Sequence, residues 1–590
     1  MTVENQLVQL ENAQLVRRLQ EQDLAYIFKH ALTQETSYQS LLVKKRREIH
    51  RRVAEAYEQV YAGSLDEYAA LLAQHYAEAG DDAKTLEYAR RAGDVSARIY
   101  ANTEAVAHYT LAIEVARRNA RPDAQLLAHL YLKRGRCLEL LSEFSKAMEN
   151  YNELETLAHI AGEAACELTA LMALATVRSI PSAARDPVEA RAICNRALDL
   201  AHALGDRRAE AKILWNLLLC NIYSGGDPHE AVAYGEQSLA IARELHLREQ
   251  EAFALHDLYI AYLYLGELER AWAVRVEASQ IWRELNNQPM LAESLSGLGL
   301  THVMRGEFAQ AFLPLEEART IGRAIGNLGA QAFSSYVASF ACLEQGETAR
   351  AFEYLKQCLP VVAHGALEGP GLDVQAQWGW IQASLGDFDG GRTLIGRSLT
   401  RAWQLIPLQR AWIYALLARI ELLAGNLEAA EEAFREGGVV PSMDNFTRMF
   451  PIGAPAMYMA AAELDLARRD CGGALHVLDE LVAHLNTSGM RVAVPAALYV
   501  RGQALLMQDE REAAITCWRQ ARIDARDMGA RTILLPILSA LSRAERERGN
   551  PTEAESLSNE AREIVRAMSA QAPDDLRQSF LNSPQVAGLV

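Results

Sequence analysis

A turn signal returns every 40 residues through the middle of this chain. A glycine followed by an acidic residue stands at 226–227, 266–267, 306–307, 346–347 and 386–387. A small residue follows five positions after each glycine, namely Ala231, Ala271, Ala311, Ala351 and Gly391. A fixed period of this length is typical of a helical solenoid, in which each repeat is one pair of helices. The sequence therefore predicts an all-α chain of stacked helix pairs.

Residues 295–321 show the pattern of one repeat. Leu298 and Gly299 lie on one face of a first predicted helix, which ends at Gly306, where glycine adopts the left-handed conformation at little cost. Glu307 opens a second helix, where a carboxylate suits the positive end of the helix dipole. Because Gly299 and Ala311 are small, we expect the two antiparallel helices to approach closely there.

The same pattern extends beyond the regular core. It is visible upstream at 142–147 and 185–190, and downstream at 425–430, 469–474, 508–513 and 549–554. We therefore expect about eleven or twelve helix pairs between residues 65 and 570. Two longer connections, 363–371 and 436–455, either belong to a binding face or simply join repeats.

The pairs Leu298-Gly299 and Gly306-Glu307, followed by Ala311 and Ala318, resemble the signature of the tetratricopeptide repeat (TPR) family in a long-unit form. The resemblance covers most of the chain. It implies a right-handed solenoid of helical hairpins, whose first helices line a concave groove that binds a protein or peptide.

The inner positions of that groove can be assigned by aligning the repeats with the family pattern. The residues assigned in this way are Asn216, Tyr223, His256, Ser296, Ser335, Trp380 and Arg419. Asn216, His256, Ser296 and Ser335 take equivalent positions in four successive repeats on this alignment, which suits a ladder for an extended peptide. The alternative is that some of them are satisfied buried polar groups and that Trp380 belongs to the core.

Composition narrows the class of partner and the compartment. The formal net charge of -17 argues against nucleic acid and against broad adhesion to anionic membranes. The 8 cysteines are scattered without a C-x-x-C pair, which suits reduced thiols rather than disulfides or a zinc site. No signal peptide and no apolar stretch long enough to span a bilayer is evident. We therefore expect a cytoplasmic protein.

Residues 1–60 do not repeat. Leucines at 7, 10, 15 and 19 indicate a short amphipathic helix, and residues 24–28 read as a brief strand. A long helix is predicted to follow from Lys29 and to carry the basic run at 44–52. Since Lys44, Arg47 and Arg51 lie at helical spacing, this run is expected to be a solvated face rather than a binding surface.

The N-terminal segment carries a second resemblance. Its motif consists of Tyr26, Phe28, His30, Tyr38, Arg46, Arg47 and His50. The motif resembles the junction of large bacterial AAA/STAND-type signal-transduction ATPases, where an ATPase and a winged-helix-like region lead into a TPR array. That group includes adenylate/guanylate cyclase–ATPase–TPR fusions and MalT-like regulators.

The junction resemblance implies a division into three parts and a partner. Residues 1–60 would be a winged-helix-like remnant with a junction helix, 61–570 the TPR-like superhelix, and 571–590 a C-terminal tail. In related ATPases a winged-helix histidine can approach the nucleotide, a role that would fall to His30; alternatively, His30 packs or caps a helix. The implied partner is an ATPase or nucleotide cyclase acting in trans.

The chain lacks the common catalytic motifs. There is no G-x-x-x-x-G-K-[ST] loop for phosphates, no second histidine after His229-Glu230, and no G-x-S-x-G elbow. We expect no enzymatic activity, no cofactor and no metal. Three hypotheses remain: a non-catalytic scaffold in signal transduction, the C-terminal part of a cyclase or STAND regulator whose nucleotide-binding part is absent, and a small-molecule sensor using the groove.

Overall fold

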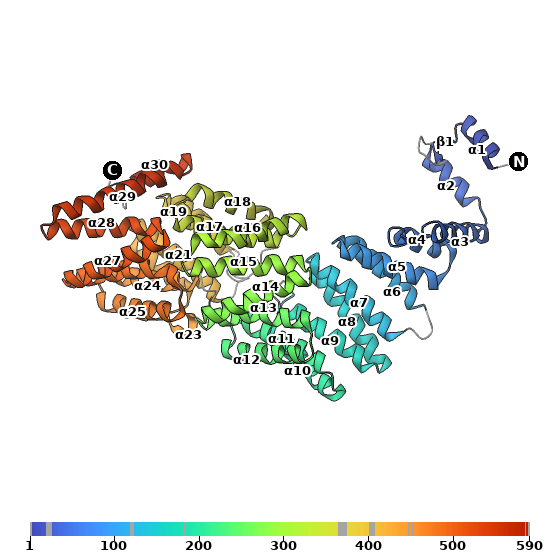
Figure 1. Ribbon diagram of the computed structural model, residues 1–590, viewed down its shortest axis with the longest axis horizontal. Coiled ribbons are helices and arrows are strands. Elements are labelled where there is room, and N and C mark those ends of the chain that lie inside the picture. Colours follow the sequence, from blue (N-terminus) through green and yellow to red (C-terminus); the bar gives the residue numbers. More distant parts are fainter. Residues whose placement is uncertain are drawn as a thin grey trace. The chain divides into compact units, whose positions relative to one another are not determined.

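The computed structural model describes residues 3–18, 26–118, 123–180, 184–363, 374–400, 407–446, 449, 453–583 and 586–587. The chain divides into two compact units, residues 1–170 and 171–590. Among the described residues, twelve antiparallel helix pairs follow one another from α5/α6 to α28/α29 (Figure 1). The all-α, TPR-like solenoid predicted from the 40-residue period is confirmed.

Unit 1 holds a small N-terminal hairpin and the first helix pairs. Its elements are α1 (Val3–Asn12), β1 (Val16–Arg18), β2 (Tyr26–Phe28), α2 (Ala31–Gln39), α3 (Val43–Val60), α4 (Ala69–Ala79), α5 (Asp82–Arg98), α6 (Asn102–Ala116), α7 (Ala124–Leu140), α8 (Phe144–Ala161) and the start of α9 (Ala164–Ser179). Its core is rich in alanine and tyrosine, which allows close helix packing with rings filling the gaps.

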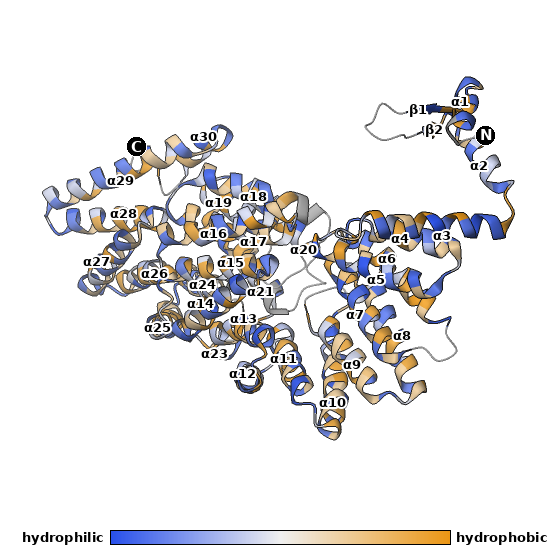
Figure 2. Ribbon diagram, turned by 45° about the vertical axis from the view of Figure 1, so that its right-hand side comes forward, coloured by the Kyte–Doolittle hydropathy of each residue, from blue (hydrophilic) through white to orange (hydrophobic). Residues whose placement is uncertain are grey.

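Unit 2 contains the regular repeats. After α9 come α10 (Pro187–Leu204), α11 (Arg207–Ser224), α12 (Pro228–Glu244), α13 (Arg248–Tyr264), α14 (Leu268–Glu284), α15 (Gln288–Met304), α16 (Phe308–Ala324), α17 (Leu328–Glu344), α18 (Thr348–Ala363), α19 (Val374–Ser384), α20 (Phe388–Thr400), α21 (Pro407–Leu423), α22 (Leu427–Gly437), α23 (Met443–Phe446), α24 (Gly453–Ala467), α25 (Cys471–Ser488), η2 (Arg491–Ala493), α26 (Val494–Met507), α27 (Arg511–Met528), α28 (Arg531–Glu547), α29 (Pro551–Gln571) and α30 (Asp574–Asn582). Many helices carry both hydrophobic and hydrophilic residues, and α28 and α29 show this clearly in Figure 2.

The N-terminal segment differs from its prediction in two places. The strand at Tyr26–Phe28 is present, but it pairs with a second strand, Val16–Arg18, so the first helix ends at Asn12. The long helix expected from Lys29 is two helices, interrupted at 40–42. The hydroxyl of Ser40 donates to the carbonyl of Ser37 at 2.7 Å, and such local bonds compete with helix continuation.

The α15/α16 pair confirms the predicted repeat. Gly306 takes the left-handed conformation, with φ of 76°. Ala311 is completely buried, and a Cβ on Gly299 would overlap the side chain of Leu315. Small residues at these positions therefore set the close approach of the two helices. In the repeat at 226, the left-handed residue is Gly225, one position earlier than in its neighbours.

Unit 2 curves until its later repeats contact its earlier ones. A Cβ on Gly346 would lie 2.8 Å from Cγ of Met568, and one on Gly386 would lie 2.6 Å from the carbonyl oxygen of Ser579. The side chain of Met528 covers Gly306 in the same way. Helix α17 also contacts α28, and α18 contacts α29. The turn glycines thus serve twice, since they end a helix and leave room for the next superhelical turn.

The structure describes most of the second of the two longer connections but only residue 363 of the first. Residues 364–371 of the first lie outside the described residues. In the second, α22 ends at Gly437, and Phe446 at the end of α23 is buried. The ring centroid of Phe446 lies 4.3 Å from that of His484 and 5.7 Å from that of Tyr458. The described part of this connection, which leaves out 447–448 and 450–452, therefore packs into the core of unit 2. Across the described residues, no helix has the length and apolar character required to cross a bilayer.

Candidate ligand-binding pocket

The first helices of seven repeats in unit 2 surround a cavity of about 520 Å³. These helices are α15, α17, α19, α21, α24, α26 and α28. Most of the lining is apolar, with Phe340, Leu343 and Met459 among its members. The volume is in the range of small-molecule sites, which combine apolar walls with a few convergent polar groups.

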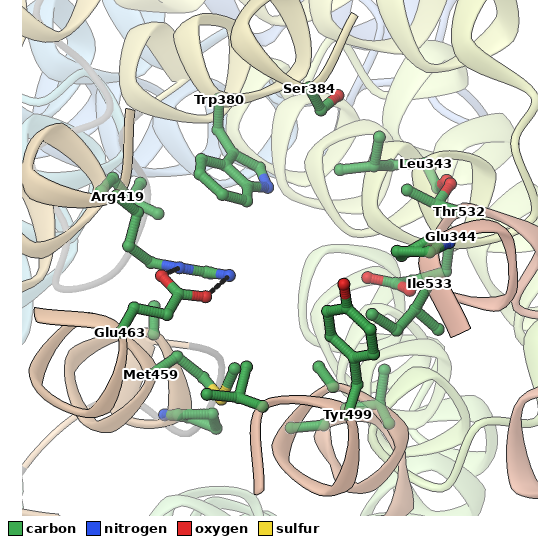
Figure 3. A pocket seen from close by; sticks show the side chains of 18 of the residues that line it. Leu343, Glu344, Trp380, Ser384, Arg419, Met459, Glu463, Tyr499, Thr532 and Ile533 are labelled. Atoms are coloured by element: carbon green, nitrogen blue, oxygen red, sulfur yellow. Dashed lines mark hydrogen bonds and ion pairs between the residues drawn. The ribbon is translucent and has the colours of Figure 1, made fainter. Parts of the chain in front are cut away.

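One wall of the cavity carries an ion pair. The guanidinium of Arg419 donates to both carboxylate oxygens of Glu463, at 2.8 and 2.9 Å. The guanidinium carbon, Cζ of Arg419, lies 4.5 Å from the ring centroid of Trp380 (Figure 3). Bidentate pairing and stacking on an aromatic ring both fix the orientation of an arginine. The positive charge of Arg419 is therefore already compensated.

Glu344 points into the cavity from the wall facing this ion pair (Figure 3). It is the last residue of α17, and within the described residues its carboxylate has no side-chain hydrogen bond. Burial raises the pKa of this carboxyl to about 7, while the charge of Arg419 acts in the opposite direction. A carboxylate without a hydrogen-bond partner in a mostly apolar cavity is costly to ionise unless a ligand pairs with it.

Further polar side chains line the cavity, among them Tyr499 and Gln377. Tyr499 directs its hydroxyl towards the centre in Figure 3 and accepts a hydrogen bond of 3.1 Å from Nε2 of Gln503. Gln377 is 1% exposed, and its Nε2 has no hydrogen-bond partner among the described residues. This nitrogen is covered by protein atoms, so it is a buried polar group behind the cavity wall and is not open to a ligand.

The raised pKa of Glu344 makes the stability of the protein depend on pH. Its ordinary value is 4.5, so between pH 4.5 and about 7 the folded protein holds a proton that the unfolded chain has released. The free energy of unfolding should therefore fall as the pH rises through this window. Glu344→Gln should remove that fall and stabilise the protein at pH 8 by at most about 3 kcal/mol, with no gain at pH 4.

Urea unfolding at a series of pH values measures this effect. Glu353→Gln is the matched control, because the side chain of Glu353 is 66% exposed. An equal pH dependence for wild type and Glu344→Gln would show that Glu344 is not held in the low-polarity cavity.

The pocket contains two of the predicted groove residues, Trp380 and Arg419. Tyr223, half-buried, packs against the core, and burial raises the pKa of its phenol. The four residues of the predicted ladder are buried. They are Asn216, His256, Ser296 and Ser335. Since their exposed fractions are 3% or less, they offer no surface to an extended peptide.

Asn216 and Ser296 make hydrogen bonds inside the protein, whereas the Ser335 hydroxyl has no hydrogen-bond partner among the described residues. The amide of Asn216 accepts from the Thr176 hydroxyl at 2.9 Å, and Ser296 donates to the carbonyl of Ala292 at 2.9 Å. Counted from the turn glycine, Ser335 lies one residue earlier in its repeat than the other three. The contacts of Asn216, His256 and Ser296 are those of satisfied buried polar groups, whereas Ser335 is buried without a partner among the described residues.

His256 belongs to a separate buried cluster. Its Nδ1 lies 3.0 Å from the Ser294 hydroxyl and 2.7 Å from Nη1 of Arg275. The Arg275 guanidinium stacks 3.8 Å from the ring centroid of Tyr259, and burial lowers the pKa of this arginine. These contacts join α13, α14 and α15 and are those of a packed polar core.

Sequence reasoning missed Glu344, Glu463 and Tyr499. The repeat carried a usable signal for the first of them. Met304, Glu344 and Ser384 each lie two residues before a turn glycine, and all three line the pocket. Trp380, which lies six residues before the turn glycine at 386, lines the pocket as well.

The junction motif is brought together only in part. The hydroxyl of Tyr38 lies 3.0 Å from Nε2 of His50, and the Arg46 guanidinium lies 5.1 Å from the Tyr38 ring centroid. Nδ1 of His50 is 2.8 Å from Nδ1 of His75, a contact that the sequence did not predict. His30 is exposed and precedes α2 without a side-chain capping bond.

The remaining junction residues lie outside this cluster. Tyr26 and Phe28 are in strand β2, and Arg47 is exposed on α3 with Lys44 and Arg51, as expected for a solvated face. The described part of the chain has no group of three or more His, Cys, Asp or Glu residues placed to hold a metal ion.

Comparisons with known proteins support the repeat fold. Residues 182–244 match the family model described as tetratricopeptide repeat. A search of curated proteins finds no relative of this chain. Among solved structures, the APC/C hetero-tetramer Cut9-Hcn1 is 15% identical over 92% of this chain and 96% of that chain, with a TM-score of 0.50. This likeness concerns the fold alone.

Two other solved structures are similar at lower scores. A STAND protein with a tetratricopeptide repeat sensor from Pyrococcus horikoshii is 13% identical over 61% of this chain and 59% of that chain, with a TM-score of 0.36. A Rap protein complexed with Competence and Sporulation Factor is 14% identical over 60% of this chain and 97% of that chain, with a TM-score of 0.44. The family match and the fold are those of a helical interaction scaffold.

Proposed function

We propose that this chain is a non-catalytic sensor scaffold, in which a ligand bound in the pocket of unit 2 biases the conformation of the TPR-like array. The observation that carries this proposal is a mostly apolar cavity in which one lining carboxylate, that of Glu344, has no side-chain hydrogen bond among the described residues. A carboxylate is costly to bury without a partner, and a ligand would relieve that cost.

The position of the cavity suits a sensor. Its walls come from helices far apart in the chain, so one ligand would contact α17, α21, α24 and α26 together. A ligand that prefers one curvature of the array shifts the population towards it. The outer faces of the helices would then present that curvature to a protein partner, as repeat arrays do.

Ligand-induced thermal stabilisation tests the proposal. A panel of small cationic, anionic and neutral molecules and short peptides should include compounds that raise the Tm of the wild type, because binding to the folded state stabilises it. Ala496→Phe should abolish the shift by filling the cavity that Ala496 lines. Leu313→Phe is the control, since Leu313 is 79% exposed on α16. Hits that bind Ala496→Phe equally well would rule out the pocket.

We also propose a signalling role in the bacterial cytoplasm, with an ATPase or nucleotide cyclase as partner in trans. The support is the resemblance of residues 26–52 to the ATPase–TPR junction. Helix α2 has no buried residue, and Leu32 and Leu42 are 78% and 80% exposed, as a docking segment requires. Affinity capture from the native host should retain a stoichiometric P-loop protein; retention of none would remove this support.

A further inference from the structure

The charges that line the pocket do not cancel. Its titratable lining residues are Glu344, Arg419, Glu463 and Tyr499. Arg419 and Glu463 neutralise one another through two hydrogen bonds. Glu344 then leaves one negative charge when it is ionised, within walls that are mostly apolar. A cavity of this kind attracts a cation and repels an anion.

From this charge pattern we infer that the pocket binds an alkylammonium or guanidinium group on an apolar stem, with Glu344 as its counter-ion. The inference rests on the proposed sensor function and names its ligand class. An anionic ligand would have to displace Glu463 from Arg419 and would also face Glu344. A cation meets neither obstacle.

The remaining walls fit both ends of such a ligand. Tyr499 points its hydroxyl towards the centre of the cavity in Figure 3, and aromatic faces attract ammonium and guanidinium groups. Leu343, Ile533 and Phe340 are apolar neighbours that can cover the stem.

Two sources can supply this chemistry, namely a free aliphatic amine and a lysine or arginine side chain of a peptide. Hexylammonium represents the first, and acetyl-Leu-Lys-Leu-amide represents the second. Hexanol, hexanoate and acetyl-Leu-norleucine-Leu-amide are the probes of matched shape without the positive charge.

Binding should also depend on pH. The carboxyl of Glu344 must be ionised to pair with the cation, and burial holds its pKa at about 7. Arg419, Glu463 and Tyr499 are the other charged or titratable groups of the lining, and burial raises the pKa of Tyr499. We therefore expect the affinity for an amine to rise between pH 6 and pH 8, whereas that of the neutral probes should not.

Isothermal titration calorimetry on the full chain at pH 8 tests the inference. At least one amine probe should bind at least about tenfold more tightly than its uncharged match, a difference of about 1.4 kcal/mol. Glu344→Gln should remove that preference, and Glu353→Gln should leave it unchanged. Preferential binding of hexylammonium indicates a free amine as the ligand, and preferential binding of acetyl-Leu-Lys-Leu-amide indicates a peptide side chain. Circular dichroism confirms that each variant is folded.

Three results would overturn the inference. They are equal binding of charged and uncharged probes, unchanged amine binding by Glu344→Gln, and no binding of either amine. If hexanol or hexanoate binds the wild type but not Ala496→Phe, the pocket remains a ligand site and only the ligand class is wrong. If nothing in the broad panel binds in the pocket, the sensor function fails as well.

Discussion

Replacing Ala311 with phenylalanine is expected to lower the free energy of unfolding by at least about 3 kcal/mol. Ala311 is completely buried at the contact between α15 and α16, where a Cβ on Gly299 would already overlap Leu315. A phenyl ring cannot enter this contact unless the helices separate. Because each repeat is held mainly by its neighbours, the loss should extend to the adjoining pairs.

Urea unfolding and hydrogen exchange both measure this loss. Amides of α15 and α16 should exchange faster in Ala311→Phe, with smaller increases in α13 and α17. Leu313→Phe makes the same kind of change on the same helix at a residue that is 79% exposed, and it should behave as wild type. If both variants unfold alike, Ala311 does not lie at the close helix contact.

Gly306→Ala is expected to destabilise the array far more than Gly549→Ala does. Both glycines end the first helix of a pair with left-handed φ values, 76° and 79°. The alanine Cβ therefore costs about 1–2 kcal/mol at either position. At Gly306 it would also overlap Met528, whereas no atom lies within 4 Å at Gly549. Crowding of this kind typically adds about 1–3 kcal/mol.

A double-mutant cycle separates the two costs. Met528→Ala removes the side chain that the new methyl group would meet, so the double variant should be less destabilised than the sum of the single variants. Gly549→Ala combined with Met528→Ala should be additive. Additivity in both cycles would mean that α27 does not cover the Gly306 turn.

The repeat pattern predicted the helix pairs because it is local. A left-handed glycine such as Gly306 and a small residue such as Ala311 act within one hairpin, and the structure has both where expected. The break at 40–42 was missed because the apolar period continues across it, while hydroxyl groups such as that of Ser40 bond to the preceding turn. Periodicity does not record that competition.

The pocket could be predicted only in part, because it depends on the curvature of the whole array. Trp380 and Arg419 were identified as inner positions, and both line the cavity. Tyr499 follows Glu344 by more than 150 residues, and the two side chains line one cavity only after the repeats have curved round. That curvature accumulates from small rotations between neighbouring repeats, which a 40-residue period does not specify.

The most direct test of this account is photo-cross-linking of protein that contains photo-methionine in place of methionine, with mass spectrometry of the joined peptides. The account predicts a cross-link from Met528 to the segment around Gly306 and one from Met568 to the segment around Gly346. Met528→Leu should remove the first and keep the second. Cross-links from both methionines that join only neighbouring repeats would contradict the closed superhelical turn, and with it the pocket.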